Sequence, residues 1–224
     1  MIASQEQLLQ EGERLDKLSR SYDGDEAVEE SYVVLTIGAS LIATLGLLAN
    51  NAAVVISAMV VAPRILPLRA LVFGSLIGDK KLLLRALLTL AIGVAITTLL
   101  SMGLGLVAGN MDLLMVVPKE ITARLQPNLL DLGIALAAGA IATYAKVNPG
   151  AVSSMAGTAI AVAVVPPICV MGIMLAAGEL DDAQGAGLFF SANLLGISIG
   201  MITFFFATRE PYFREKLRTQ NLPI

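Results

Sequence analysis

The sequence has neither histidine nor tryptophan, and it has only one cysteine, Cys169, among 224 residues. Without histidine, the chain lacks both the side chain that most often changes charge near neutral pH and the commonest metal ligand. A single cysteine excludes an internal disulfide and a cysteine-cluster metal site. We therefore predict no catalytic residues, no metal and no cofactor, and we predict that the protein is not an enzyme.

Charged residues are also scarce. They make up 15% of the chain, against 56% hydrophobic residues, and the mean hydropathy is +0.79. Soluble domains carry about 25% charged residues. No Asp, Glu, Lys or Arg occurs in residues 31–63 or 147–178, and about 20 apolar residues are enough to cross a bilayer. The composition predicts an all-α, multi-pass protein whose surroundings are lipid rather than nucleic acid.

The charges that are present divide the chain into three parts. Residues 1–30 contain nine acidic and three basic residues, and we predict a short amphipathic cytoplasmic helix followed by a linker. A solvated acidic tail is the alternative reading. Residues 31–208 form the predicted transmembrane domain, and residues 209–224 form a basic cytoplasmic tail.

The transmembrane domain contains six hydrophobic segments, which we predict to be about six transmembrane helices. They cover approximately residues 32–49, 52–77, 82–108, 129–145, 151–177 and 185–208. Prolines interrupt two of them. Pro63 and Pro67 lie in the second segment, and Pro166 and Pro167 lie in the fifth.

The basic residues predict the orientation of these segments. With the N-terminus in the cytoplasm, eleven basic residues fall inside and only Lys119 and Arg124 fall outside. The inside set is Arg14, Lys17, Arg20, Lys80, Lys81, Arg85, Lys146, Arg209, Arg214, Lys216 and Arg218. Insertion follows such a bias. We predict a multi-pass protein of the inner (plasma) membrane with both termini in the cytoplasm.

Short matches relate the two halves of the chain. The matched pairs are Ile42-Ala43-Thr44 with Ile141-Ala142-Thr143, the polar hinges Asn50-Asn51 with Asn148-Pro149-Gly150, and Val60-Val61-Ala62-Pro63 with Val164-Val165-Pro166-Pro167. Three spans per half is an odd number, so the halves enter the membrane in opposite senses. This pattern predicts a 3+3 inverted repeat, in which the second and fifth helices are broken by proline.

The proline breaks are the predicted functional site. Proline removes a backbone donor, and broken backbone at membrane depth is tolerated where it packs in protein or lines a wet cavity. Arg64 follows Pro63 directly, near the middle of its span. Either it lines a substrate or ion pathway, or the span ends early and Arg64 extends to the cytoplasmic surface. The other candidate pathway residues are Arg69, Pro67, Pro166, Pro167, Ser57, Asn50, Asn51, Asp131, Asn148 and Asn193.

Two stretches resemble a known family. They are residues 41–63, which end in Val60-Val61-Ala62-Pro63, and Val165-Pro166-Pro167-Ile168-Cys169, with Asn193-Leu194-Leu195-Gly196-Ile197 further on. Together they resemble a prokaryotic family of hydrophobic membrane proteins catalogued as domain of unknown function 389. The resemblance implies a multi-span inner-membrane protein and supplies no substrate. This chain differs from the family pattern at Arg64, where a small apolar residue or leucine is usual, and at Ser57, where glycine is common.

Two functions compete at this stage. The first is a channel or secondary transporter for a small ion or solute, with an anion favoured because of the arginines. The second is a membrane scaffold that transports nothing and recruits partners through its N-terminal segment. Small residues spaced by four, such as Ser101, Gly105 and Gly109, let helices approach closely, and we predict a homo-oligomer. The sequence leaves open the transported species and the choice between channel and carrier.

Overall fold

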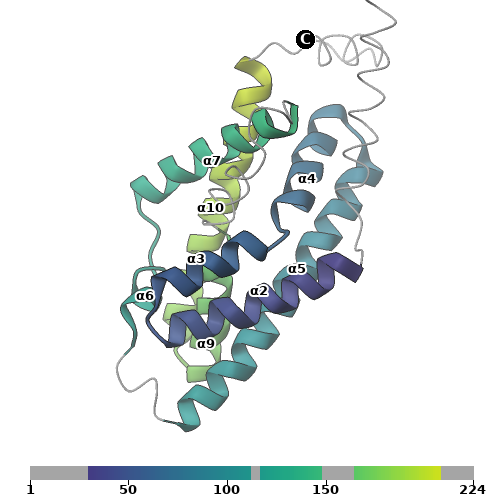
Figure 1. Ribbon diagram of the computed structural model, residues 1–224. Helices are drawn as coiled ribbons and strands as arrows, with labels where there is room; N and C mark the ends of the chain where they lie inside the picture. The colour runs from purple at the N-terminus through teal and green to yellow at the C-terminus, as the bar shows by residue number, and fades with distance from the viewer. Residues whose placement is uncertain (1–29, 112–116, 148–163, 208–224) are drawn as a thin grey trace, which may run out of the picture.

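The computed structural model describes residues 30–111, 117–147 and 164–207. Within these ranges every regular element is a helix, so the predicted all-α class is confirmed for the described part of the chain (Figure 1). The helices are α2 (Glu30–Leu48), α3 (Ala52–Val61), α4 (Ile65–Ile77), α5 (Lys80–Asn110), α6 (Lys119–Thr122), α7 (Leu129–Val147), α9 (Val165–Ala177) and α10 (Leu180–Ala207).

Three described helices, α2, α5 and α10, are long and apolar enough to cross a membrane. Helices α3 and α4 pass the same test together, as a pair bent by 54°, which raises the count to four. Helices α7 and α9 are apolar but shorter. The first part of the predicted fifth span, residues 151–163, lies outside the described residues. The helices are thus compatible with a membrane protein, and the count of six spans stays a prediction.

Most predicted segment boundaries agree with the helices to within two residues, but the last segment was predicted to begin too late. Helix α10 begins at Leu180 rather than Gly185, and its first turn includes Asp181 and Asp182. Carboxylates at a helix N-terminus are stabilised by the exposed N–H groups and the helix dipole. Two adjacent aspartates therefore start this helix, where the prediction placed a loop.

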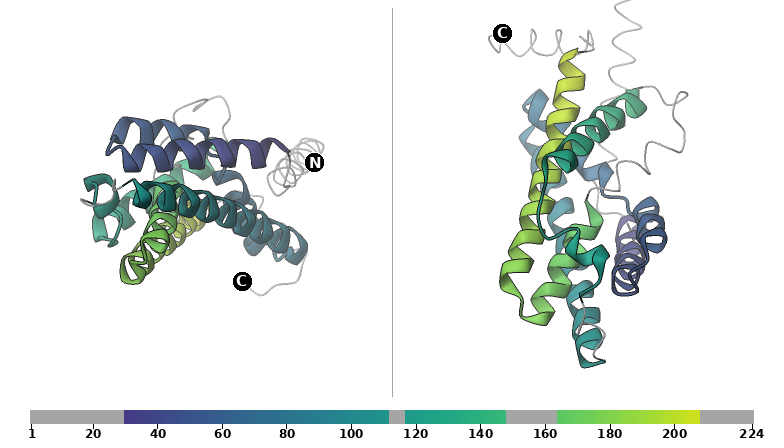
Figure 2. Two further views of the ribbon diagram at one scale, coloured as in Figure 1. Left: turned by 90° about the horizontal axis from the view of Figure 1, so that it is seen from below. Right: turned by 90° about the vertical axis from the view of Figure 1, so that its left-hand side faces the viewer.

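Helices α5 and α10 organise the packing. Helix α5 contacts α2, α4 and α9, whereas α10 contacts α7, α9 and α4. Helices α2 and α3 lie side by side at one flank (Figure 2). The chain direction of α5 is opposite to that of α10, since one descends and the other rises in Figure 1. Glycines permit these close approaches, because a Cβ added at Gly172 of α9 would lie 2.7 Å from the carbonyl oxygen of Thr98 in α5.

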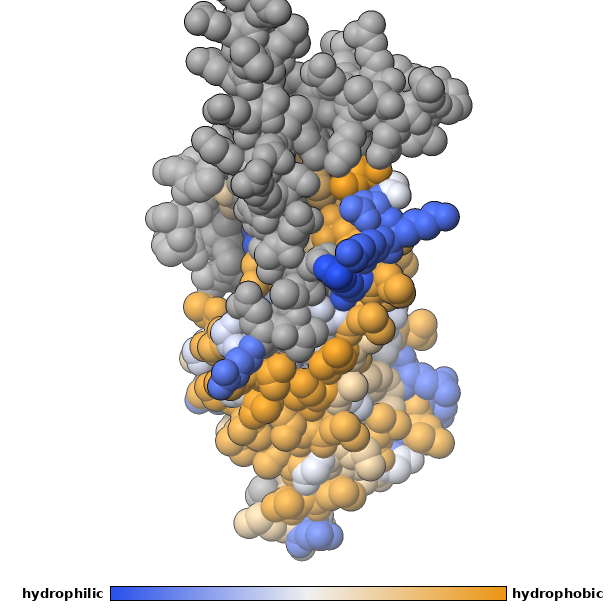
Figure 3. Space-filling view, turned by 90° about the vertical axis from the view of Figure 1, so that its right-hand side faces the viewer, coloured by the Kyte–Doolittle hydropathy of each residue, from blue (hydrophilic) through white to orange (hydrophobic). Residues whose placement is uncertain are grey.

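Much of the exterior is apolar, and the interior holds several polar side chains beside its apolar core. Large apolar side chains on α2 and α5 are exposed, among them Leu45 at 53% and Leu99 at 69%, and one face of the molecule carries a broad apolar band (Figure 3). Several polar side chains are buried instead, namely Thr36, Ser40, Thr44, Arg64, Thr89, Thr97, Ser101, Thr143 and Asn193. An apolar exterior suits lipid contact, and the buried polar side chains need hydrogen-bond partners at the helix interfaces.

Candidate functional site

The chain leaves the helical conformation between α3 and α4. Ala62 has extended backbone angles, with φ −70° and ψ 122°, and Arg64 precedes the first residue of α4. Pro63 in this break has no N–H to donate, and Pro67 lies in the first turn of α4, where a backbone N–H has no partner within the helix. The two prolines thus favour a helix end followed by a helix start.

Arg64 extends from this break into the bundle. Its side chain is 2% exposed, and its Nη2 donates a hydrogen bond to Thr97 Oγ1 of α5. Its Nε and Nη1 have no hydrogen-bond partner among the described residues. Arg64 is thus buried among the described helices, and its place in a pathway stays a prediction.

The partner of Arg64 belongs to a ladder of polar contacts between α2 and α5. Ser40 and Thr97 share a hydroxyl–hydroxyl hydrogen bond of 2.7 Å, and Thr44 and Ser101 share one of 2.8 Å. Near the start of α2, the Tyr32 hydroxyl donates to the carbonyl oxygen of Thr89 at 3.2 Å. The two residues of each rung are separated by 57 positions. A constant difference means that α2 and α5 run parallel in a fixed register.

This ladder was not predicted from the sequence. Its hydroxyls also bond to carbonyls of their own helix, since Ser40 donates to the oxygen of Thr36 at 2.6 Å and Thr44 to that of Ser40 at 2.7 Å. Serine and threonine in apolar helices commonly form such bonds to the carbonyl one turn back. The available signal was the spacing by four of Tyr32, Thr36, Ser40 and Thr44, which places them on one face of α2.

A second polar region lies in the other half of the chain. A half-open pocket of about 260 Å³ is bounded by α6, α7, α9 and α10. Its lining residues are Glu120, Ala123, Arg124, Asp131, Ile134, Pro167, Phe189 and Asn193. Three charged side chains therefore share this pocket with Pro167 and Asn193. Pro167 lies in the first turn of α9, and Asn193 is 3% exposed.

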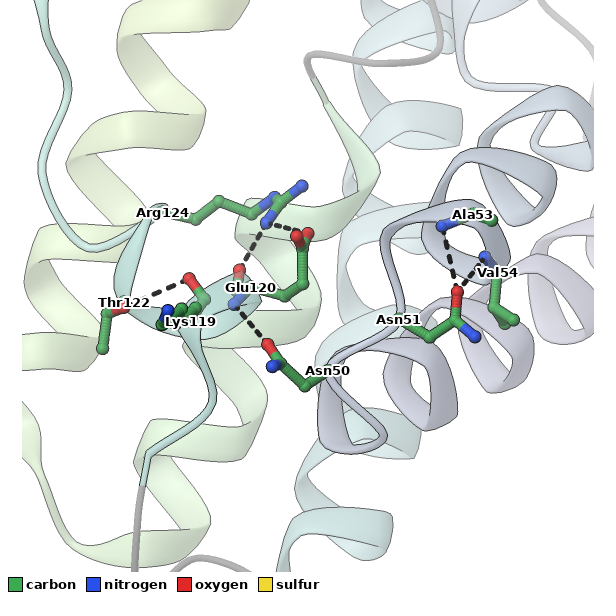
Figure 4. Close-up of polar contacts among 8 residues, drawn as sticks. All are labelled: Asn50, Asn51, Ala53, Val54, Lys119, Glu120, Thr122 and Arg124. Carbon is green, nitrogen blue, oxygen red and sulfur yellow. Dashed lines mark hydrogen bonds and ion pairs between the residues drawn. The ribbon is translucent and has the colours of Figure 1, made fainter.

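Hydrogen bonds fix the pocket-lining residues of α6 and of the residues that follow it (Figure 4). Arg124 Nη1 donates to Glu120 Oε2 at 2.9 Å and to the backbone oxygen of Glu120. The backbone N–H of Glu120 donates to Asn50 Oδ1 at 3.1 Å. Ile121 between them is fully buried in the core. Helix α6 thus anchors the pocket to the hinge that follows α2.

A family model for the Domain of unknown function DUF389 matches residues 59–199. The chain belongs to the DUF389 family. The matched range includes Arg64, the ladder residues of α5 and the whole pocket, whereas α2 precedes it. The family description assigns no activity to any of these residues.

One curated relative matches the chain. It is the uncharacterized protein MJ0678 of Methanocaldococcus jannaschii, which is 28% identical over 176 residues. The alignment covers 78% of this chain and 53% of the relative, so the chain spans about half the length of the curated protein it matches. No solved structure matches the chain significantly.

Eight of the twelve residues predicted for a functional site of this DUF389 protein fall into three groups. Pro63, Arg64 and Pro67 meet at the first break, and Asp131, Pro167 and Asn193 line the pocket. Asn50 and Asn51 stabilise the hinge, where Asn51 Oδ1 accepts from the N–H groups of Ala53 and Val54 at 3.1 and 3.3 Å (Figure 4).

The other predicted residues do not line the pocket. Ser57 is exposed and donates to the carbonyl oxygen of Val54 at 2.8 Å. Arg69 is half-buried on α4, and Pro166 is buried at the start of α9 without lining the pocket. Asn148 lies outside the described residues.

Proposed function

We propose that the protein is a membrane transport protein, either a channel or a secondary carrier, that moves a small ion or solute past its broken helices and favours an anion. The observation that carries the proposal is the burial of Arg64 at the first break. A charge inside the membrane costs at least about 2.5–3.5 kcal/mol on insertion scales and marks a pathway or a paired site by default. No described carboxylate faces Arg64, which leaves the pathway reading favoured.

The proposal includes a 3+3 inverted repeat, and the lengths of the helices support it. Helices α2 and α7 each have 19 residues, and α4 and α9 each have 13. Both α4 and α9 end at a left-handed glycine, Gly78 with φ 71° and Gly178 with φ 80°, and the next helix begins two residues later. When the two halves are aligned on these two glycines, Pro67 rather than Pro63 corresponds to Pro167.

The opposite directions of α5 and α10 (Figure 1) also agree with two halves of inverted topology, as do the basic residues predicted to lie inside. In this scheme both termini are cytoplasmic, and α6 and the pocket face the outside. The pocket then provides an opening towards the second break at Pro167. Inverted-repeat transporters bind their substrates near such breaks. A homo-oligomeric assembly is part of the proposal and rests on the sequence alone.

Flux into proteoliposomes tests the proposal. We expect wild-type protein to move a small anion and Arg64→Gln to lower the flux at least about tenfold, since a hydrogen bond to a charged group contributes about 1.5–3 kcal/mol. Arg85→Gln is the matched control, because Arg85 is an exposed arginine in the first turns of α5. Wild-type vesicles that pass neither anions nor cations would rule the proposal out.

The alternative scaffold function depends on residues 1–29, which lie outside the described residues. None of the described contacts favours it, and it stays a prediction from the sequence.

A further inference from the structure

The pocket bounded by α6, α7, α9 and α10 combines charged and apolar walls. Glu120, Arg124 and Asp131 bring its charges, and Asn193 brings a buried amide. The remaining lining residues are apolar, namely Ala123, Ile134, Pro167 and Phe189. A ligand that fits this lining therefore has a charged group and an apolar body.

The charges of the lining do not cancel. Arg124 Nη1 donates to Glu120 Oε2 at 2.9 Å, so these two side chains form an ion pair and offset each other. Asp131 has no ion-pair partner among the described residues, and its Oδ2 accepts only from the backbone N–H of Asn128 at 3.3 Å. Lys119, on the same short helix as Glu120, is exposed and does not line the pocket. The lining thus presents one uncompensated negative charge.

A ligand can reach these groups. The pocket is half-open and holds about 260 Å³. The side chains of Arg124 and Glu120 are 19% and 23% exposed, and Asp131 is half-buried. A single water needs about 10–15 Å³, whereas drug-sized ligands occupy pockets of about 300–1,000 Å³. The pocket is therefore much larger than one bare ion requires, and it suits a small organic molecule.

We propose that this pocket is a binding site for a small organic cation of the alkylammonium class. The ammonium group pairs with the Asp131 carboxylate through charge-assisted hydrogen bonds, and the alkyl body contacts Ile134 and Phe189. The inference goes beyond the proposed function and does not rest on it, because Arg64 and the first break are not part of this pocket.

The lining disfavours ligands of other classes. Asp131 repels an anion, and the attraction of Arg124 for it is already offset by Glu120. A neutral molecule of the same shape leaves the Asp131 carboxylate without a counter-charge. A bare sodium ion can pair with Asp131 but leaves the apolar walls in contact with water, whereas an alkyl chain removes apolar surface of Ile134 and Phe189 from water.

Equilibrium dialysis of radiolabelled propylammonium against the full chain in non-ionic detergent micelles measures the binding, with empty micelles as the blank for partitioning. We expect saturable binding to wild-type protein that unlabelled propylammonium displaces. Propanoate, propanol and sodium, each at equal concentration and constant ionic strength, should not displace it. Propanoate and propanol have the same chain length as the probe and differ from it in charge, so they separate the effect of charge from that of shape.

Asp131→Asn removes the charge and keeps an oxygen that can accept from Asn128, and we expect it to weaken propylammonium binding at least about tenfold. Asp79→Asn is the matched control. Asp79 is also a carboxylate at the start of a helix, where it accepts from the N–H groups of Lys81 and Leu82. It is exposed and lies outside the pocket, so Asp79→Asn should bind propylammonium like wild type.

Ile134→Phe decides the question if Asp131→Asn does not fold. Ile134 is 54% exposed, so the larger ring can be accommodated, and it narrows the pocket without a change of charge. We expect this variant to bind propylammonium more weakly than wild type.

The inference is overturned by the absence of saturable binding in wild type or by equal displacement with propanoate, propanol or sodium. Unchanged binding in Asp131→Asn, or in Ile134→Phe where Asp131→Asn does not fold, also overturns it. Propylammonium binding by a protein that passes no ions would refute the transport proposal and leave this site standing.

Discussion

Asn50 accepts a hydrogen bond from the backbone N–H of Glu120, which lies 70 positions further along the chain, at 3.1 Å. Asn50 also has a left-handed backbone, with φ 52°, a conformation that asparagine adopts more readily than most residues. The backbone of Asn50 therefore forms the turn between α2 and α3, and its side chain joins this turn to α6 beside the pocket.

Two substitutions at Asn50 separate these roles. Asn50→Gly keeps the left-handed turn and removes the bond to Glu120, so we expect a loss of about 1 kcal/mol of stability. Asn50→Ala also strains the left-handed turn, and we expect it to lose about a further 1 kcal/mol of stability. Thermal unfolding of the purified protein in one detergent checks the order. Equal melting temperatures for the two variants would show that the turn carries no strain.

The close approach of α7 to α10 depends on Gly139. A Cβ added there would collide with the backbone of Ile197 in α10, whereas one added at Gly133, also on α7, would meet nothing within 4 Å. We expect Gly139→Ala to destabilise the protein by about 1–3 kcal/mol, because backbone must move to admit the methyl group. Gly133→Ala should leave the melting temperature unchanged or raise it slightly, since alanine favours the helix. A Gly139→Ala protein as stable as wild type would place α7 further from α10.

The Thr44–Ser101 rung is suited to a double-mutant cycle. Thr44→Val and Ser101→Ala each remove one hydroxyl of a bonded pair, and the double variant removes both. Cycles on such bonds in membrane proteins average about 0.6 kcal/mol, and we expect a coupling of that size in denaturant unfolding. Thr44→Val combined with Ser198→Ala, on the distant helix α10, should show additive effects. Additivity at the rung itself would mean that its hydroxyls act independently.

The opposite directions of α5 and α10 predict opposite exposure of their first residues. In a Cys169→Ala background, we expect a membrane-impermeant thiol reagent to reach Leu180→Cys from outside intact cells. It should reach Lys80→Cys only after the cells are opened. The reason is that both helices begin next to a left-handed glycine but run in opposite senses. Labelling of both positions from the same side of the membrane would contradict the proposed inverted-repeat topology.

The positions of the helices were predictable from the sequence because apolar runs and punctuating residues act locally. Asp79 accepts from the N–H groups of Lys81 and Leu82 at 3.0 and 3.1 Å and so begins α5. Gly78 ends α4 in the left-handed conformation that glycine adopts at no steric cost. The start of α10 was misplaced because Asp181 and Asp182 indicate a surface loop as readily as a helix N-terminus.

The site was less predictable, since it depends on which helix faces which. Arg64 attracted attention because a charge in an apolar span is expensive, and that argument needs no partner. Ser40 and Thr97 gave no such signal, because serine and threonine are common in membrane helices. Their relation is visible only when the parallel register of α2 and α5 is known. Asp131 and Asn193 were candidates one at a time, but their shared pocket depends on the packing of α7 against α10.

The constant register between α2 and α5 also has a mechanical consequence. The Ser40–Thr97 and Thr44–Ser101 bonds join the two helices at positions four residues apart. Sliding one helix along the other by less than four residues, about 6 Å, would break both bonds without forming another. The pair is therefore expected to move as one rigid body. In the transport cycle that we propose, a displacement that admits or releases a ligand is then expected to fall on α3 and α4, the two short helices joined at Pro63 and Arg64.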